Sequence, residues 1–125
     1  MNPAIAAPSG GRVLDLMQQR LERALRQRVR YRYVRPRVLR EGEAFRIESP
    51  CCSRNVDPAG GVIDIALLVP GTPRASRRQP GRVVQNWRLF ARDHANGTWV
   101  AQDESDQLDE LMDVLCVDAQ RIYWP

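Results

Sequence analysis

Apolar side chains recur at steps of three and four residues between Val13 and Arg28. The series comprises Leu14, Met17, Leu21 and Leu25, with Ala24 beside them. This spacing places the apolar side chains on one face of a helix, so it predicts an amphipathic α-helix. We expect Ser9 or the Gly10–Gly11 pair to open this helix, and residues 1–12, rich in Pro, Ala, Ser and Gly, to form a flexible tail.

The period of the pattern changes to two directly after this helix. Apolar Val29, Tyr31 and Tyr33 alternate with basic Arg28, Arg30 and Arg32. The alternation predicts a strand with one apolar and one arginine face. Pro36 favours an edge position or a bend for residues 34–39. Residues 40–43 resemble a turn and precede the alternating segment from Phe45 to Ile47, so a hairpin is expected here.

Three further strands are predicted at Ile63–Val69, Val83–Arg92 and Thr98–Ala101. Asn96–Gly97 is a strong hairpin signal between the last two. The segment Pro70–Gly81 is rich in Pro, Gly and Arg, and we expect it to be a flexible basic loop. Asp64 interrupts the first of these strands; because a lone buried carboxylate is costly, it should face an arginine or water.

A second amphipathic helix is predicted near the end of the chain. Ser105 is a candidate cap, and the apolar stripe comprises Leu108, Leu111, Met112 and Leu115. Ile122–Trp124 is too apolar for a free tail and should dock on the core. The element order predicts one α+β domain over residues 13–125, with about five antiparallel strands and an N-terminal and a C-terminal helix packed on one face of the sheet.

The composition is that of a globular protein, with 43% apolar and 27% charged residues. The longest apolar run, Ile65–Val69, is far shorter than the roughly 18 residues that a membrane span needs. The sequence opens without the pattern of a secretory signal, and its three cysteines are an odd number, which argues against a secreted disulfide scaffold. We therefore expect a cytoplasmic protein with reduced thiols and no membrane contact.

Charge is unevenly distributed along the chain, and every basic side chain other than His94 is arginine. Residues 1–60 carry 12 arginines and 6 acidic residues, whereas residues 103–125 carry 1 arginine and 7 acidic residues. Such asymmetry indicates either an interaction surface or a basic element packed beside an acidic helix.

The arginine-rich segment supports two hypotheses about a partner. Clustered cations can neutralise phosphates and tyrosines can stack on bases, so nucleic acid is one candidate. Alternation turns Tyr31 and Tyr33 away from the arginines, however, which favours an acidic protein partner or simple pairing with the acidic second helix. The candidate contact residues are Arg28, Arg30, Arg32, Arg35 and Arg37 in the segment and Arg74, Arg77 and Arg78 in the loop.

A thiol or metal site is the third hypothesis. Cys51, Cys52 and His94, with Asp57 and Cys116 as further candidates, are the residue types that a metal or a thiolate nucleophile requires. Adjacent cysteines reach one tetrahedral ion with difficulty, and the C-x-x-C unit is absent. Ordinary thiols are therefore the favoured interpretation, and no cofactor is predicted.

Two other groups of residues resemble functional motifs but are better explained by structural roles. The glycine-rich run Asn55–Gly61 fails as a phosphate loop, because a strand and not a helix follows it. Trp87, Trp99 and Trp124 could form a recognition patch, but large aromatics at alternating strand positions are usually core residues. We therefore expect these three rings in the core.

The C-terminal third resembles a family of short bacterial proteins of unknown function. The resemblance rests on Trp87–Asp93, Gly97–Trp99, the acidic Leu-rich helix Leu108–Leu115 and the closing Ile122–Trp124. The N-terminal order of a helix leading into a basic strand is also similar, whereas the Cys51–Cys52 loop and the segment Pro70–Gly81 depart from the family pattern. The resemblance implies no activity.

The sequence thus predicts a non-enzymatic interaction module that contacts an acidic partner through its basic strand face and the loop at residues 70–81. A nucleic-acid-binding protein is the first alternative, and a cysteine- or metal-dependent enzyme is the second.

Overall fold

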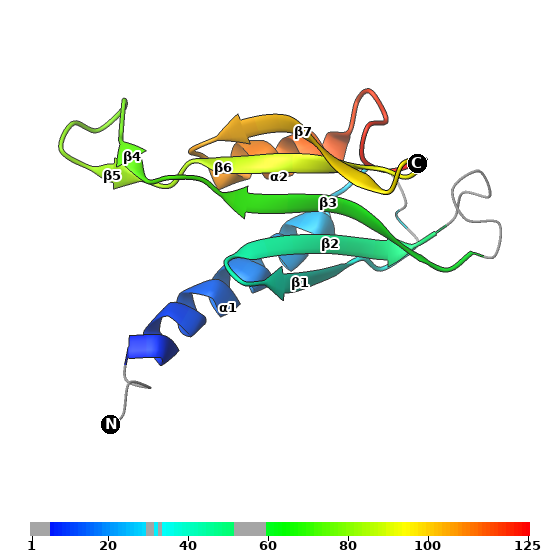
Figure 1. The fold of residues 1–125 in the computed structure, drawn as a ribbon, viewed down its shortest axis with the longest axis horizontal. Helices are drawn as coiled ribbons and strands as arrows, with labels where there is room; N and C mark the ends of the chain where they lie inside the picture. The colour runs from blue at the N-terminus through cyan, green and yellow to red at the C-terminus, as the bar shows by residue number, and fades with distance from the viewer. Residues whose placement is uncertain (1–5, 30–31, 33, 52–59) are drawn as a thin grey trace.

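The computed structural model describes residues 6–29, 32, 34–51 and 60–125. Five antiparallel strands form the main sheet in the order β1-β2-β3-β6-β7. Their bounds are β1 Arg37–Glu41, β2 Ala44–Pro50, β3 Val62–Pro70, β6 Trp87–Asp93 and β7 Thr98–Ser105. Helices α1 (Ala6–Leu25) and α2 (Leu108–Val117) both lie behind this sheet in Figure 1. The predicted α+β architecture is confirmed.

A single core lies between the helices and the sheet. Leu21 and Leu25 of α1 and Leu111 and Leu115 of α2 are each at most 2% exposed. They pack in one cluster with inward-facing strand residues such as Phe45, which is fully buried. The two predicted helical stripes therefore bury their apolar faces against the same side of the sheet.

Two tight turns place the strands as predicted. Gly42 joins β1 to β2 with φ of 64°, and Gly97 joins β6 to β7 with φ of 65°. Both values lie in the left-handed region, which glycine adopts at little cost. Gly42–Glu43 and Asn96–Gly97 therefore lie in turns, as the sequence predicts, whereas Arg40 and Glu41 of the first predicted turn belong to β1.

The local predictions were wrong at several places. Helix α1 begins at Ala6, so Ser9 and the Gly10–Gly11 pair lie inside it, and residues 6–12 belong to the helix. Within the predicted strand over residues 29–33, the described residues Val29 and Arg32 lie in bends and turns.

The segment after β3 contains a second, two-stranded sheet where a flexible loop was predicted. Strand β4 (Arg74–Ala75) pairs with β5 (Val83–Val84) to form a hairpin that projects from the main sheet in Figure 1. The predicted strand over residues 83–92 is consequently interrupted between β5 and β6. Gln107 and not Ser105 precedes α2, and the Ser105 hydroxyl accepts the N–H of Gln107 at 2.9 Å.

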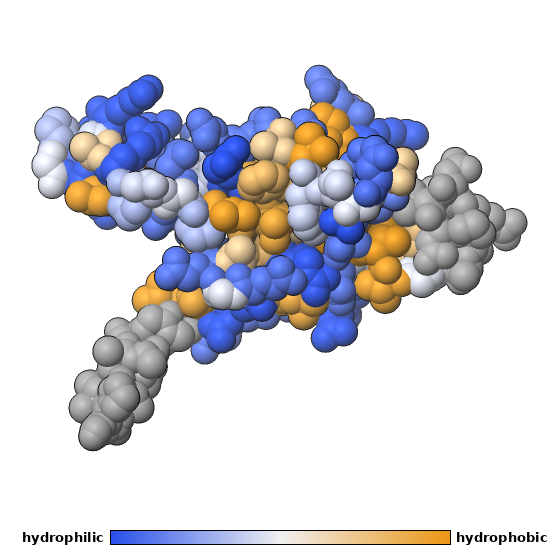
Figure 2. All heavy atoms as spheres, in the orientation of Figure 1, coloured by the Kyte–Doolittle hydropathy of each residue, from blue (hydrophilic) through white to orange (hydrophobic). Residues whose placement is uncertain are grey.

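The face of the sheet opposite the helices carries a network of charges. Arg46 lies 2.7 Å from Asp64, 2.5 Å from Glu41 and 3.1 Å from Glu48. The bond to Asp64, and then the bond to Glu41, raise the pKa of Arg46. The prediction that Asp64 faces an arginine is confirmed. Figure 2 shows this face, on which hydrophobic residues lie between hydrophilic ones.

Only two of the three tryptophans are core residues. Trp87 is 7% exposed and Trp124 is fully buried. Trp99 is half-buried, because its pairing with Arg92 places it on the face opposite the helices, with the Arg92 guanidinium 4.9 Å from its ring centre. The expectation that Trp99 lies in the core was therefore wrong.

A carboxylate anchors the end of the chain. Asp118 caps α2 in a left-handed conformation, with φ of 44°. Its carboxylate accepts the backbone N–H groups of Ile122 at 2.7 Å, Tyr123 at 3.2 Å and Trp124 at 2.9 Å. We call residues 118–124, held in this way, the C-terminal clasp. The clasp docks Tyr123 and Trp124 on the core, as the sequence predicts, while Ile122 stays 37% exposed.

We predict that Asp118→Ala lowers the free energy of unfolding by about 3 kcal/mol, because three backbone N–H groups lose a charged acceptor in a buried setting. Urea denaturation followed by Trp fluorescence measures the change. Asp113→Ala, an exposed acid on the same helix, is the matched control and should change stability by at most about 0.5 kcal/mol. Equal losses in both variants would mean that the clasp contributes no more than an ordinary surface acid.

Candidate interaction surface

A basic cavity lies between the end of α1 and the start of β1. Its volume is about 420 Å³. We call it the arginine pocket; it is lined by Glu22, Leu25, Arg26, Arg28, Arg32, Val34, Arg35 and Pro36. Four cations thus face one acidic residue in its described wall. Arg28, Arg32 and Arg35 of the predicted contact residues come together here, and Arg30 lies outside the described residues.

Arg28 fixes the shape of this pocket from within. Its side chain donates to the carbonyl of Leu25 at 2.8 Å and to the carbonyl of Val34. Its guanidinium lies 5.3 Å from the ring centre of Trp124. Arg28 is only 6% exposed, and this burial lowers its pKa, with Cys116 opposing the shift. The predicted contact residue Arg28 is therefore a buried anchor that ties the segment after α1 to the C-terminal clasp.

The side chains of the other three arginines of the pocket are exposed to solvent. Arg26, Arg32 and Arg35 are exposed, and within the described part of the chain no salt bridge involves any of them. Their neighbours Leu25, Val34 and Pro36 add an apolar wall. The pocket can therefore receive an anionic group that also presents a small apolar surface.

The remaining predicted cations of the β4–β5 hairpin are mostly used within the molecule. Arg74 lies 3.5 Å from Asp106, and Arg78 lies 3.3 Å from Glu110. Arg77 is exposed. Together with the 2.5 Å pair between Arg20 and Asp109, these contacts join basic elements to the acidic start of α2. The predicted pairing of a basic element with the acidic helix exists, but it uses arginines other than those of residues 26–35.

Arg37 lies outside the arginine pocket. It is on β1, with its side chain 73% exposed and 3.9 Å from Glu48. Because Arg37 pairs with Glu48 in the ladder between β1 and β2, it belongs to the charged face of the sheet opposite the helices.

The described residues do not assemble a metal site. No group of three His, Cys, Asp or Glu side chains in the described part of the chain is placed to hold a metal ion. Cys52 and Asp57 lie outside the described residues. Cys51 is buried, and its N–H donates to the carbonyl of Gly61 at 2.7 Å. His94 lies in the turn after β6, where burial and then Arg92 lower its pKa, against Asp64 and Asp93.

Cys116 is a structural thiol. It is 6% exposed, and its Sγ donates to the carbonyl of Ala24 at 3.4 Å. Burial, and then the charge of Asp113, raise its pKa to about 11, with Arg28 opposing the shift. The protonated form dominates near neutral pH, so this thiol is a poor nucleophile.

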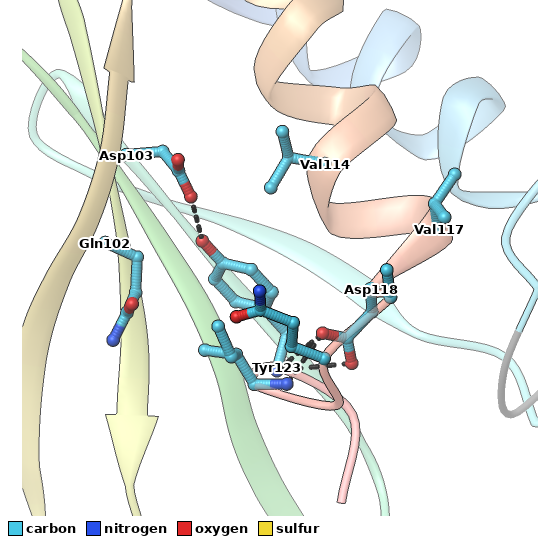
Figure 3. A pocket seen from close by; sticks show the side chains of 9 residues that line it. Gln102, Asp103, Val114, Val117, Asp118 and Tyr123 are labelled. Carbon is cyan, nitrogen blue, oxygen red and sulfur yellow. Dashed lines mark hydrogen bonds between the residues drawn. The ribbon is translucent and has the colours of Figure 1, made fainter.

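A second hollow, of about 380 Å³, lies between β7 and the end of α2. Val114, Val117 and Ile122 form its apolar side, and Asp103 and Gln102 of β7 form its polar side. Figure 3 shows the Tyr123 hydroxyl pointing to Asp103, to which it donates at 3.0 Å.

Sequence reasoning missed this hollow, although one signal for it was available. Val114 and Val117 are three residues apart and fall outside the buried stripe of α2, which contains Leu108, Leu111 and Leu115. Two apolar residues on the wet side of an otherwise acidic helix indicate a second apolar contact.

A family model described as a domain of unknown function, DUF3024, matches residues 12–125. The chain belongs to this family. The DUF3024 match covers both the arginine pocket and the hollow beside β7, and it confirms the resemblance to a family without known activity. No curated protein and no solved structure matches the chain. Among the described helices, none has the length and apolar character needed to cross a membrane.

Cys116 is the single cysteine of a Cys51→Ala, Cys52→Ala variant. We predict that at pH 8 it reacts with iodoacetamide about 100-fold more slowly in the native protein than in urea. The reason is that a pKa of about 11 in place of 9.0 lowers the thiolate fraction by that factor. Mass spectrometry of timed samples gives both rates.

Alkylation of the unaltered protein at mildly acidic pH tests the thiol hypothesis separately. Rapid modification of Cys51 or Cys52 under these conditions would require an activated thiolate and would favour a cysteine-dependent activity.

Proposed function

We propose that this DUF3024 chain is a non-enzymatic interaction module of the cytoplasm, and that it binds an acidic segment of a partner protein through the arginine pocket. The observation that carries the proposal is the trio Arg26, Arg32 and Arg35. These exposed cations surround one cavity and have no salt bridge within the described part of the chain. Cys116 is a thiol that donates to a backbone carbonyl and forms no disulfide, which fits the reducing conditions of the cytoplasm.

The pocket suits a short acidic segment because its basic area is small. Duplex recognition relies on a basic stripe that follows the phosphate backbone over several contacts. Elsewhere on this molecule, arginines such as Arg20, Arg40 and Arg46 pair with carboxylates of the chain itself. A compact cluster beside Leu25, Val34 and Pro36 is matched better by two or three carboxylates next to an apolar side chain.

The module acts by binding alone. A cysteine- or metal-dependent reaction would need a nucleophile beside a base or a cluster of ligands, and the described residues supply no such arrangement beyond the single turn histidine His94 and two buried thiols. Binding energy would come from charge-assisted hydrogen bonds between the guanidinium groups and carboxylates.

The test uses a fluorescein-labelled peptide of sequence Glu-Leu-Asp-Glu-Leu-Glu. We predict that the Arg26→Gln, Arg32→Gln, Arg35→Gln variant binds it about tenfold more weakly than the unaltered chain. A tenfold loss of affinity corresponds to about one charge-assisted hydrogen bond. Fluorescence anisotropy at low salt measures both affinities. The control is Arg77→Gln, Arg82→Gln, Arg88→Gln, which removes the same charge from three other exposed arginines and should change the affinity less than twofold.

Equal weakening in both variants would show that net charge, and not the pocket, determines binding. The same two variants, titrated with single-stranded and duplex DNA and RNA at several salt concentrations, test the nucleic-acid alternative. Tighter binding to nucleic acid than to the peptide, with affinity falling by roughly 0.9 log units per tenfold salt for each duplex phosphate contacted, would replace the acidic protein partner with nucleic acid.

A further inference from the structure

Strand β7 forms one edge of the main sheet. Among the described strands it pairs only with β6, so the backbone N–H and C=O groups along its other side can pair with a further strand. Val100 pairs with the core residue Ala91, and Asp103 pairs with the core residue Leu89. The side chains of Val100 and Asp103 therefore point to the helix side of the sheet, where the hollow lies.

The hollow beside this edge collects apolar side chains that the fold leaves exposed. Val114 is 39%, Val117 is 52% and Ile122 is 37% exposed. All three line the same cavity, together with the ring of Tyr123 (Figure 3). Single exposed apolar residues are ordinary, but several gathered in one concave site beside a free strand edge indicate a contact surface.

The charge around the hollow selects the partner. The lining contains two carboxylates, Asp103 and Asp118, and no cation. The carboxylate of Asp118 accepts backbone N–H groups of the clasp. Asp103 of β7 is exposed and accepts only the Tyr123 hydroxyl among the hydrogen bonds described above. Strand β7 itself carries Asp103 and Glu104 and no cation. Edge-to-edge pairing of two copies would add like charges to one ladder, so a basic segment fits better than a second copy.

We propose that the free edge of β7 binds an extended basic segment of a partner protein as a sixth strand of the sheet. Main-chain hydrogen bonds to β7 supply the pairing, as in other complexes formed by strand addition. Alternate side chains of the added strand point to the helix side, where one apolar side chain enters the hollow against Val114, Val117 and Ile122. The arginine or lysine at the adjacent position points to the opposite face of the sheet, on which Glu104 of β7 lies. This site is separate from the arginine pocket and does not depend on the function proposed for it.

The test uses a fluorescein-labelled peptide of sequence Arg-Ile-Arg-Ile-Arg-Ile-Arg at low concentration. We predict that Val117→Arg weakens its binding at least about tenfold, because the new cation occupies the apolar wall and repels the peptide. Val62→Arg, at a valine that is 63% exposed elsewhere on the surface, is the matched control and should change the affinity less than twofold. Both substitutions are at exposed positions, and circular dichroism checks that each variant is folded.

Two altered peptides separate strand addition from simple charge attraction. Replacing each isoleucine by serine should abolish binding, because no side chain then fills the hollow. Methylating alternate backbone nitrogens should also abolish it, because the peptide can no longer donate to β7. Hydrogen exchange should slow at residues 98–105 when the unaltered peptide binds. Unchanged affinity of either altered peptide, or unchanged exchange in β7, would overturn the proposal.

Sedimentation of the protein alone completes the test. The proposal expects a distribution that is the same for the unaltered chain and for Val117→Arg. A dimer in the unaltered chain that Val117→Arg dissociates would overturn the proposed partner and assign the edge to a second copy.

Discussion

The burial of Trp124, one residue before the end of the sequence, is the constraint on which the remaining structure depends. The indole is fully buried, and its Nε1 donates to the carbonyl of Leu115 at 2.9 Å. The carboxylate of Asp118 accepts the backbone N–H of Trp124 at 2.9 Å, which fixes the backbone that carries the indole. Without this residue the core would lose its largest fully buried side chain, and α2 would lose a bond to its last turn.

Two classes of arginine follow from this architecture. A single helix layer leaves one face of the sheet open to water, and Arg46 makes that face stable by neutralising Asp64, Glu41 and Glu48. Arginines of this kind hold the fold together. Arg26, Arg32 and Arg35 line the arginine pocket instead, and no salt bridge within the described part of the chain involves them. The proposed function rests on the second class, and the composition of the chain does not distinguish the two classes.

Sequence patterns predicted the elements whose causes are local. The left-handed glycines of two hairpins and the apolar stripes of both helices are each decided within a few residues. The segment after α1 differs because Arg28 is held by Trp124, which is distant in sequence, and by the carbonyls of Leu25 and Val34. The alternation of apolar and basic residues over residues 28–33 carries no information about such a long-range contact.

The same limit applied to the candidate sites. Ten arginines between residues 20 and 46 suggested a basic contact surface, but pairing with Asp109, Asp15 and Glu48 could be found only in three dimensions. Trp99 faces away from the core because it pairs with the outward-facing Arg92. Alternation alone did not identify the buried face, because neighbouring β6 carries an apolar side chain on each face, Leu89 inward and Phe90 outward.

Adjacent residues of the C-terminal clasp connect the two candidate surfaces. Trp124 supports Arg28 at the base of the arginine pocket, and Tyr123 forms part of the hollow beside β7 through its bond to Asp103. Neighbouring residues of one turn, fixed by Asp118, therefore contribute to a basic site and to an acidic and apolar site. Because the clasp is rigidly bonded to α2, the relative position of the two sites is set by the core. Under the two proposals, an acidic segment and a basic segment of partner proteins would be held in a fixed arrangement, a role that needs no catalytic group.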